Sequence, residues 1–317
     1  MSILVLALNP SIDAEWRVDD VLWEEKNDVH SERRWAGGKG INVARWLKYL
    51  GAPAQLLLPL GGRTGGELAG YLRGEKIPAR ILRLREATRV NAIVTTNAGR
   101  QMRFNAPGPK LSRAELAKLF ATVEPHLRAL ARPAQKTGLG SPAVAPAAPS
   151  VLLVLSGSLP RGVPLTAYAR LIRVAHRYGV RTVLDCDGPA FAAAVPARPF
   201  LVKPNEHELA QWWRQPLRSE AELVRAARAL AEQTGGWVMV SRGAKRSLLL
   251  NPAENFQSFA PPPRAKPRNT VGAGDAMLAA VAQQIQRGTP PPEWLRGGLA
   301  TGTAATKLRP GQLPGGD

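Results

Sequence analysis

The sequence predicts an α/β fold in which a doubly wound, mostly parallel sheet lies between layers of helices. Short apolar runs with the length of buried strands alternate with stretches whose apolar residues recur at helical spacing. Polar or charged residues follow several of these runs, as expected where the carboxyl ends of parallel strands gather at one edge of a sheet. Two predicted helices begin with glycines, which allow a ligand to approach the backbone N–H groups.

Length and composition favour a globular chain and exclude several other classes of protein. The 317 residues suffice for one α/β domain or two smaller ones, and an apolar fraction of 44% excludes a disordered chain. The sequence has no apolar run of membrane-spanning length, and its first residues lack the basic start of a signal peptide. Cys186 is the only cysteine, so we interpret it as a core thiol and expect a cytoplasmic location.

The charge of the chain indicates anionic partners. Lysine and arginine number 43 against 24 acidic residues, which gives a formal net charge of +19. Such a charge suits nucleic acid, but it also attracts anionic metabolites. Because the basic residues are spread through every segment, without interleaved aromatics or zinc-finger spacing, we expect small anions and not nucleic acid or a membrane as partners.

The first half of the chain begins with residues 3–8, a continuous apolar run typical of a strand that is buried on both faces. Asp13 follows this run, where a polar ligand is expected. The next expected elements are a helix over about 40–50, a strand over 55–60, a helix ending near 76, a strand over 79–84 and an amphipathic helix over 112–132. Residues 133–149, rich in proline, alanine and glycine, are interpreted as a flexible surface connection.

Two polar segments interrupt this alternation. Residues 14–36 contain three of the eight tryptophans and have no helical period. Residues 88–106 contain two strand-like runs on either side of a hairpin turn at 97–100. We expect the two segments to form a small sheet that covers the site as a lid. Two ordinary surface hairpins are the alternative.

The alternation resumes in the second half of the chain. The expected parallel strands cover residues 151–155, 182–184, 200–202 and 237–240. Helices are expected over about 164–178 and 219–234. Residues 247–250 are expected to pair antiparallel at an edge of the sheet.

The segment that begins at Asn269 predicts an anion site with an adjacent base. Apolar residues at helical spacing predict a helix over about 272–288, and small residues occupy its start. The first N–H groups of a helix have no helical partner, and the helix dipole adds partial positive charge, so an anion is favoured there. Asp275 places a carboxylate in the first turn, as phosphoryl transfer to a hydroxyl requires. The alternative is a glycine-rich helix start with a capping aspartate.

A second glycine-rich helix start covers residues 37–44, Gly-Gly-Lys-Gly-Ile-Asn-Val-Ala. Its lysine, Lys39, is placed to contact a charged ligand. The spacing is not that of a P-loop, which requires a lysine followed by serine or threonine.

These motifs resemble the two signatures of the PfkB-type carbohydrate kinases, which have the ribokinase-like fold. The signatures correspond to residues 37–44 and 269–275. Further stretches match in order and at family spacing, at residues 8–13, 88–91, 156–160 and 203–208. The resemblance covers nearly the whole chain. It implies one kinase domain over residues 1–317, with a three-layer, mostly parallel sheet and a β lid formed by about 14–36 and 88–106.

The resemblance also implies a role for each site residue. Asp275 would take the proton from a sugar hydroxyl, and the anion hole for the γ-phosphate of ATP would consist of Gly272, Ala273 and Gly274. The residues that would hold the sugar are Asp13, Gly37, Gly38, Lys39, Asn42, Arg89, Arg103 and Ser158, with Lys39, Arg89 and more weakly Arg103 meeting its phosphate. Those along the nucleotide would be Lys203, Asn205, Ser241, Gly243 and Thr270. Asp185 and Glu208 would position Mg²⁺, mostly through water.

The motifs look most like the phosphosugar branch of the family. The first choice is the 1-phosphofructokinase reaction, from fructose 1-phosphate to fructose 1,6-bisphosphate, with 6-phosphofructokinase or tagatose-6-phosphate kinase as alternatives. A non-catalytic sensor of sugar phosphate or nucleotide is the rival from another class, although binding alone does not require Asp275. The lid tryptophans would suit a homodimer in which two lids pair face to face.

Several positions depart from the family pattern. Arg246 stands where the family usually has glycine, Arg242 where leucine is common, and Ala276 where the phosphosugar branch often has serine. The chain also ends soon after Pro314, where the family usually continues through a last helix. Because that end helps to build the adenine pocket, the nucleotide preference stays open.

Overall fold

Strand β1, Ile3–Leu6, lies inside the main sheet and is buried on both faces. It pairs in parallel with β4, Ala54–Gly61, on one side and with β8, Leu152–Ser156, on the other. Such a strand needs apolar side chains in both directions, which explains the continuous apolar run near the start of the sequence.

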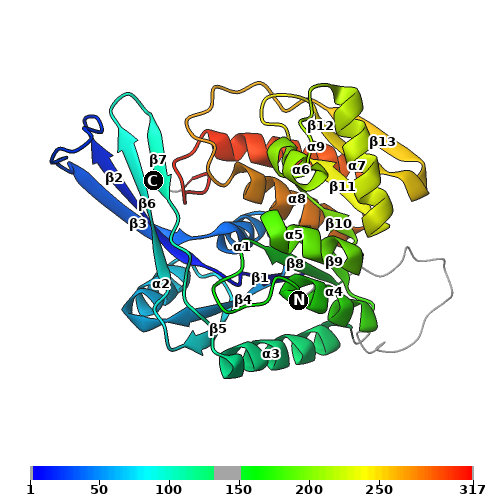
Figure 1. Cartoon of the computed structure of the whole chain (residues 1–317), viewed down its shortest axis with the longest axis horizontal. Helices are drawn as coiled ribbons and strands as arrows, with labels where there is room; N and C mark the ends of the chain where they lie inside the picture. Colours follow the sequence, from blue (N-terminus) through cyan, green and yellow to red (C-terminus); the bar gives the residue numbers. More distant parts are fainter. Residues whose placement is uncertain (1–2, 132–150, 316–317) are drawn as a thin grey trace.

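The computed structural model describes residues 3–131 and 151–315. The predicted surface connection over 133–149 therefore lies outside the described residues. The remaining strands of the main sheet are β5 (Ala79–Leu84), β9 (Arg181–Asp185), β10 (Leu201–Val202), β11 (Trp237–Val240), β12 (Ser247–Asn251) and β13 (Phe256–Ala260). Within the described ranges this sheet has nine strands in the order β13-β12-β11-β10-β9-β8-β1-β4-β5 (Figure 1). The neighbours from β11 to β5 pair in parallel, whereas β12 pairs antiparallel with both β11 and β13.

Helices cover both faces of the main sheet. One face carries α1 (Lys39–Tyr49), α2 (Gly62–Gly74), α8 (Ala273–Arg287) and α9 (Pro291–Thr306). The other face carries α3 (Arg113–Ala131), α4 (Ala167–Arg177), α5 (Gly188–Ala194), α6 (Glu206–Trp213) and α7 (Glu220–Thr234). Along β1 the side chains alternate between these layers, so Leu4 and Leu6 pack in one core and Ile3 and Val5 in the other. The three-layer, doubly wound fold is confirmed.

The predicted elements are present, with ends that differ by a few residues, and several more were not predicted. The sequence patterns did not predict α5, α6, α9 and β13. Strand β12 pairs antiparallel with β11 as expected, but its predicted place at the edge was wrong, because β13 covers its outer side. The glycine-rich stretch that begins at Gly62 forms the first turns of α2.

A separate, smaller sheet forms the lid, whose strands are β2 (Ser11–Val18), β3 (Ser31–Gly37), β6 (Arg89–Thr96) and β7 (Gln101–Phe104). Their order is β3-β2-β6-β7, and this sheet stands beside the carboxyl ends of the main sheet (Figure 1). The two polar segments of the sequence thus combine as expected, since β2 pairs in parallel with β6. The predicted turn at 97–100 joins β6 and β7, which pair antiparallel.

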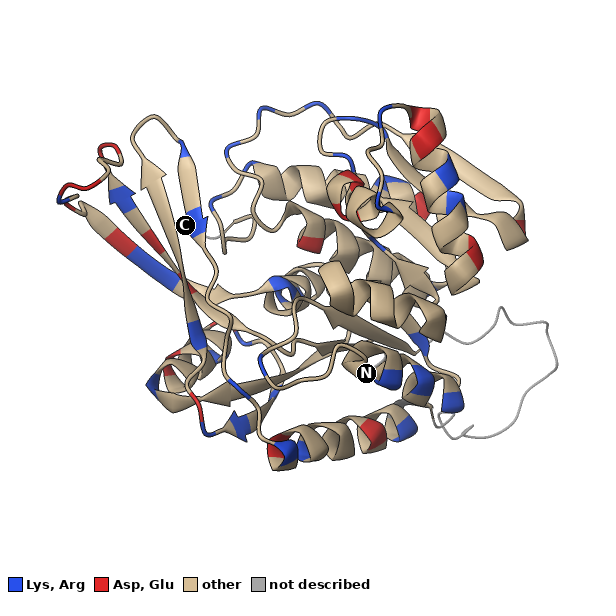
Figure 2. Ribbon diagram, in the orientation of Figure 1, with Lys and Arg blue, Asp and Glu red and all other residues tan. Residues whose placement is uncertain are grey.

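The distribution of charge and the cysteine agree with the composition. Figure 2 shows lysine and arginine spread over the lid, the helices and the loops in this view. Cys186 is buried, and burial raises the pKa of its thiol well above the ordinary value, as expected for a core thiol. Among the described residues, no helix combines the length and the apolar character needed to cross a membrane.

The packing of α9 against α8 depends on a small residue at Gly298. An added methyl group there would lie 2.9 Å from Val281 Cγ2 and 3.1 Å from Met277 Cγ, closer than ordinary van der Waals contact. We expect Gly298→Ala to lower the free energy of unfolding by about 1–3 kcal/mol, measured by urea denaturation, because overpacking a core forces its neighbours apart.

The preceding glycine in the same helix provides the control. A methyl group at Gly297 would meet no atom closer than Gln284 Nε2 at 3.5 Å. Gly297→Ala should therefore raise the free energy of unfolding by up to about 1 kcal/mol, because alanine favours a helix more than glycine does. Equal stabilisation by both substitutions would contradict the close approach of α9 to α8.

Candidate active site

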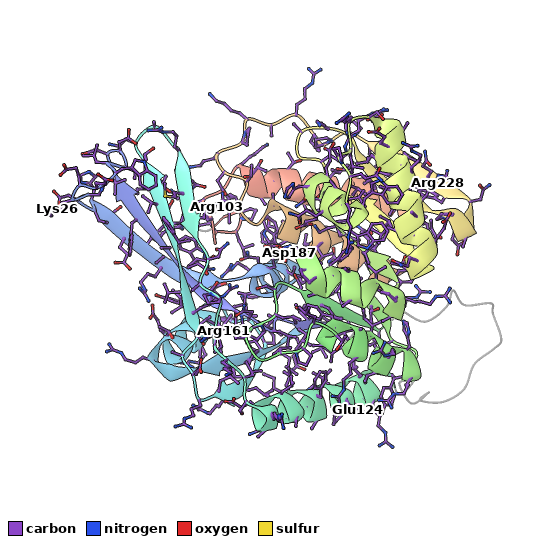
Figure 3. All side chains as sticks on the ribbon, viewed as in Figure 1. Lys26, Arg103, Glu124, Arg161, Asp187 and Arg228 are labelled. Carbon is purple, nitrogen blue, oxygen red and sulfur yellow. The ribbon has the colours of Figure 1, made fainter. Side chains whose placement is uncertain are left out.

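One cavity of about 1070 Å³ lies beyond the carboxyl ends of the parallel strands, between the main sheet and the lid. Arg103 on β7 and Asp187 after β9 border this cavity from the lid and from the main body (Figure 3). The predicted site residues that line it are Asp13, Gly38, Lys39, Asn42, Arg89, Arg103, Ser158, Asp185, Lys203, Asn205, Glu208, Ser241, Gly243, Thr270, Gly272, Ala273, Gly274 and Asp275. Gly37 is the predicted residue that does not line it.

The start of α8 has the geometry of an anion site. Gly272 precedes the helix with a φ of 77°, in the left-handed region that favours glycine. The side chain of Lys203 lies beside the same turn, because a methyl group at Gly274 would lie 3.6 Å from Lys203 Nζ. Free helical N–H groups and a lysine therefore act on the same space, and both favour an anion.

Asp275 is buried in the first turn of α8 and is held by Asn42, whose Nδ2 donates a hydrogen bond to Oδ2 of Asp275 at 2.8 Å. The pKa of Asp275 is raised to about 6, mainly by burial and then by the negative charge of Asp185. Lys39, the hydrogen bond from Asn42 and Lys203 oppose this rise in pKa. A carboxylate with this pKa is ionised at neutral pH and is still basic enough to accept a proton.

Asp185 connects the two lysines of the cavity. It ends β9, and its carboxylate oxygens lie 3.1 Å from Lys39 Nζ and 3.4 Å from Lys203 Nζ. Burial acts to raise the pKa of Asp185, but the charges of Lys203 and Lys39 outweigh it and hold that pKa below the ordinary value. Lys39 also lies 3.5 Å from Glu208 Oε1, and although burial opposes its charge, these carboxylates keep its pKa above the ordinary value.

Two of the residues predicted to lie along the nucleotide, Asn205 and Ser241, come together at the start of α6. Asn205 and Glu208 form a capping box, in which each side chain accepts a hydrogen bond from the backbone N–H of the other, at 2.8 Å. Ser241, after β11, lies against this start, because its N–H donates to the carbonyl of Pro204 at 3.1 Å and its carbonyl accepts from the N–H of Glu206 at 3.0 Å. The ends of β10 and β11 thus form one wall.

Asp185 and Glu208 are the two carboxylates of this wall that were predicted to position Mg²⁺. Within the described ranges, no group of three or more His, Cys, Asp or Glu side chains gathers as a metal cluster. Mg²⁺, however, keeps several waters and binds proteins through one or two carboxylates together with substrate phosphates. Asp185 and Glu208 both face Lys39 on the cavity wall, so the two carboxylates fit that mode of binding.

Asp13 belongs to the lid sheet and is held by its neighbours. Ser11 Oγ and Asn91 Nδ2 donate hydrogen bonds to Oδ1 of Asp13, at 2.8 and 3.0 Å. Burial raises the pKa of Asp13 above the ordinary value, although these hydrogen bonds oppose the rise. Gly37 lies behind it, where a methyl group would come within 2.2 Å of Asp13 Cγ, so Gly37 provides room for Asp13 and is not itself a wall of the cavity.

The three basic residues predicted to meet the sugar phosphate have different neighbours. Arg89 donates hydrogen bonds to the carbonyls of Ala106 and Asn9, at 2.7 and 2.8 Å. Lys39, in contrast, is paired with carboxylates at the other side of the cavity. Arg103 Nη2 donates to Gln101 at 3.0 Å.

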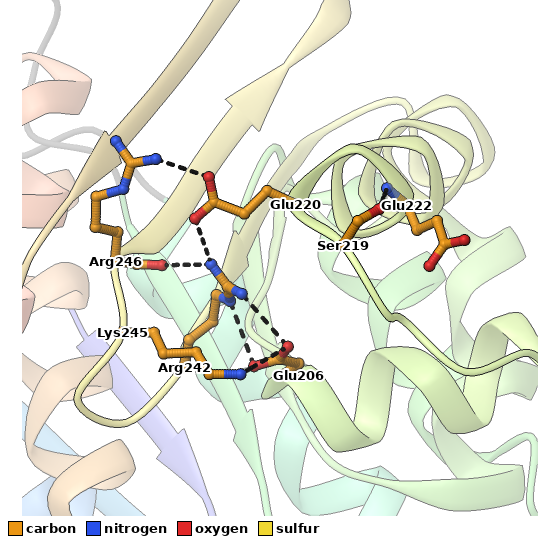
Figure 4. A network of polar contacts seen from close by, with 7 residues as sticks. All are labelled: Glu206, Ser219, Glu220, Glu222, Arg242, Lys245 and Arg246. Carbon is orange, nitrogen blue, oxygen red and sulfur yellow. Dashed lines mark hydrogen bonds and ion pairs between the residues drawn. The ribbon is translucent and has the colours of Figure 1, made fainter.

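The departures at Arg242 and Arg246 have a structural explanation. The loop between β11 and β12 carries both arginines, and they bind the carboxylates that begin α6 and α7 (Figure 4). Arg242 Nη1 lies 2.9 Å from Glu220 and its Nε lies 3.3 Å from Glu206, while Arg246 Nη2 lies 2.7 Å from Glu220. Arg242 is nearly buried, with 6% of its side chain exposed. These ion pairs fix the loop that places Ser241 in the cavity wall.

Several cavity residues were not identified from the sequence. Asn91 lies in the motif at residues 88–91, which predicted no role for it, although its side chain donates a hydrogen bond to Asp13. Arg264 lies in the proline-rich loop before α8 and also lines the cavity, and its basic character next to a predicted anion site was the available signal. Asn9 lines the cavity as well, and its Nδ2 donates to Ser158 Oγ at 3.1 Å.

Comparison with known proteins places this arrangement in a family. The family model described as pfkB family carbohydrate kinase matches residues 7–313. The chain is 33% identical over 307 residues to ATP-dependent 6-phosphofructokinase isozyme 2 of Escherichia coli, covering 96% of this chain and 92% of the relative. It is 34% identical over 287 residues to 1-phosphofructokinase of Xanthomonas campestris, covering 89% of this chain and 83% of the relative.

A solved structure agrees with these relatives. The crystal structure of phosphofructokinase-2 from Escherichia coli in complex with potassium has a TM-score of 0.85 and 31% sequence identity, covering 97% of this chain and 93% of that chain. The match extends over both the main sheet and the lid. The chain therefore belongs to the pfkB family of carbohydrate kinases.

Proposed function

We propose that this chain is an ATP- and Mg²⁺-dependent kinase that acts on a phosphorylated ketohexose. Fructose 1-phosphate is the first candidate substrate, and fructose 6-phosphate and tagatose 6-phosphate are the alternatives. The observation that carries the proposal is the position of Asp275, whose carboxylate lies in the first turn of a helix that begins as an anion site, within a cavity that also contains arginines.

In the proposed reaction, Asp275 accepts the proton of a sugar hydroxyl while that hydroxyl oxygen attacks the γ-phosphate of ATP. The N–H groups after Gly272 bind the phosphoryl oxygens, and Lys203 lies beside them. Because phosphoryl transfer depends mainly on positioning and charge neutralisation, these fixed donors supply most of what the reaction needs. Mg²⁺, when bound near Asp185 and Glu208, supplies further positive charge to the phosphates.

Lys39 and Arg89 have separate roles in this proposal. The contacts of Lys39 with Asp185 and Glu208 favour a place beside the transferred phosphoryl group. Arg89, and Arg103 on the lid, remain for the phosphate that the sugar already carries. Asp13 accepts hydrogen bonds from sugar hydroxyls in the same part of the cavity, next to the lid.

Turnover on a panel of sugars tests the proposed substrate class. With ATP and Mg²⁺, we expect ADP release with fructose 1-phosphate, fructose 6-phosphate or tagatose 6-phosphate to exceed that with fructose or ribose in kcat/KM. The physical reason is that a bound phosphate makes charge-assisted hydrogen bonds with arginine, which a free sugar lacks. A coupled assay of ADP release measures the ranking.

Arg89→Ala is the matched variant for this experiment. It should raise KM for the phosphosugar and leave KM for ATP nearly unchanged, because Arg89 lies on the lid side of the cavity. Preference for a free sugar would contradict the assignment of Arg89 while leaving the kinase in place. ATP binding without turnover on any sugar would instead favour the non-catalytic sensor.

The role of Asp275 is tested by its protonation. Only the ionised carboxylate accepts a proton, so kcat should fall as the pH decreases through about 6, the raised pKa of Asp275. Asp275→Asn should lower kcat by roughly a hundred- to ten-thousandfold, the usual contribution of a general base. Calorimetry should still detect ATP binding to this variant. Turnover close to that of the native chain would exclude Asp275 as the base.

The lid exposes apolar side chains that suit a second copy of this chain. Trp23 is 75% exposed and Leu22 57%, on the outer part of the lid, and Phe104 on β7 is 54% exposed. We propose that two lids pair in a homodimer, because burying Leu22 and Trp23, which are neighbours in the chain, removes apolar surface from water.

Sedimentation velocity at micromolar concentration tests the dimer. The native chain should sediment as a dimer, and Trp23→Glu should shift it toward the monomer because the charge would be buried in the interface. Leu165→Glu is the control, since Leu165 is similarly exposed, at 53%, but lies on the main body. A native chain that sediments as a monomer would exclude a lid-mediated dimer at this concentration.

A further inference from the structure

Arg45 is a buried cation that the proposed reaction does not use. It lies on α1, and only 3% of its side chain is exposed. Its Nε and Nη2 donate to the two carboxylate oxygens of Glu75, at 2.5 and 2.8 Å, and Nη2 also donates to the carbonyl of Ala36 at 2.7 Å. The remaining nitrogen, Nη1, donates to Oδ1 of Asn42 at 2.9 Å.

Asn42 connects Arg45 to the carboxylate of Asp275. The two ends of its amide differ, because the oxygen only accepts hydrogen bonds and the nitrogen only donates them. Arg45 can only donate, so the oxygen of Asn42 must face Arg45 and the NH₂ group must face Asp275. The reversed amide would place its NH₂ group against the guanidinium and its oxygen against the carboxylate, and both contacts would be repulsive.

The contacts form a chain across three helices. Glu75 follows α2 as its capping residue, Arg45 and Asn42 lie one turn apart on α1, and Asp275 begins α8. The bidentate contact with Glu75 fixes the plane of the guanidinium. A fixed guanidinium also fixes the directions of the N–H bonds of Nη1, and Nη1 donates to Asn42 Oδ1.

We propose that Arg45 is a positioning residue for catalysis, which fixes the amide of Asn42 so that Asn42 donates to Oδ2 of Asp275. The other carboxylate oxygen of Asp275 is then left to accept the proton. This inference rests on the proposed role of Asp275 as the base. Arg45 does not line the large cavity, and it reaches Asp275 through Asn42. Its charge also lowers the pKa of Asp13, and the charge-conserving Arg45→Lys keeps that charge in place.

The charges around Asp275 set the sign of the expected effect. Asp185 faces it from β9, Lys39 from α1 and Lys203 from the end of β10, and none of these changes when Arg45 is replaced. The hydrogen bond from Asn42 lowers the pKa of Asp275. When that bond is lost, the pKa of Asp275 rises, so the fall of kcat at low pH should begin at a higher pH.

A double-mutant cycle tests the inference. Arg45→Met and the charge-conserving Arg45→Lys should each lower kcat by about ten- to a hundredfold, the range for a hydrogen bond to a charged group, and leave KM for ATP within about twofold. Both should move the acidic limb of kcat to higher pH. In an Asn42→Ala background, Arg45→Lys, which keeps the charge that acts on Asp13, should have no further effect on kcat or on the acidic limb.

Two controls separate positioning from stability. Arg34→Met removes another bidentate arginine pair, between Arg34 on β3 and Glu67 on α2, at 2.8 and 3.0 Å. This variant should leave the acidic limb of kcat unchanged. Glu75→Gln keeps one of the two acceptors of Arg45, so we expect a shift of the acidic limb that is smaller than the shift in Arg45→Met. Because a sugar phosphate also titrates near pH 6, the shift between variants is the quantity measured.

A titration of the Asp275 carboxyl by ¹³C NMR, with Asp275→Asn to assign the signal, gives the same information without turnover. A native chain without turnover would contradict the proposed function, while the titration would still test Arg45. An unchanged titration of Asp275 in Arg45→Lys and Arg45→Met would overturn the inference. A loss of kcat from Arg45→Lys that persists without Asn42 would overturn it as well.

Discussion

The ion pairs of Asp185 with Lys39 and Lys203 are the interaction on which the rest of the cavity depends. Asp185, Glu208 and Asp275 line the same cavity, and burial of a carboxylate without a partner favours its neutral form. The two lysines keep Asp185 ionised, and through their charge they limit the rise in the pKa of Asp275. Because Asp185 ends β9, Lys39 begins α1 and Lys203 follows β10, these pairs also fix the relative positions of three elements.

The sheet explains why the lysines and carboxylates meet. Parallel strands direct their carboxyl ends to one edge, so residues far apart in the chain become neighbours there. The starts of α1 and α8 face the same edge, and glycines at both starts leave the backbone accessible. The lid borders the remaining side with Asp13, Arg89 and Arg103. In the proposed reaction, each of the two sheets therefore binds a different part of the substrates.

The sequence predicted those features that depend on local patterns. The period of α8, the apolar run of β1 and the hairpin turn at 97–100 were correct because neighbouring residues determine them. Contacts between distant residues were not predictable in this way. The pairing of Lys39 with Asp185, the place of Gly37 behind Asp13 and the position of β13 outside β12 all depend on how segments pack, which no local period records. The residues that line the cavity were thus predicted better than the residues that they contact.

The ion pairs of the cavity have a consequence for how the molecule attracts and accepts its ligands. The chain has a formal charge of +19, yet the part of the cavity wall around Lys39 and Lys203, here called the inner wall, carries three carboxyl groups, Asp185, Glu208 and Asp275, against two lysines. The long-range field therefore increases the rate at which anions of any kind reach the protein. The inner wall favours an anion that arrives together with a cation. The net charge of the whole chain thus affects how fast anions arrive, whereas the inner wall of the cavity determines which anion is bound.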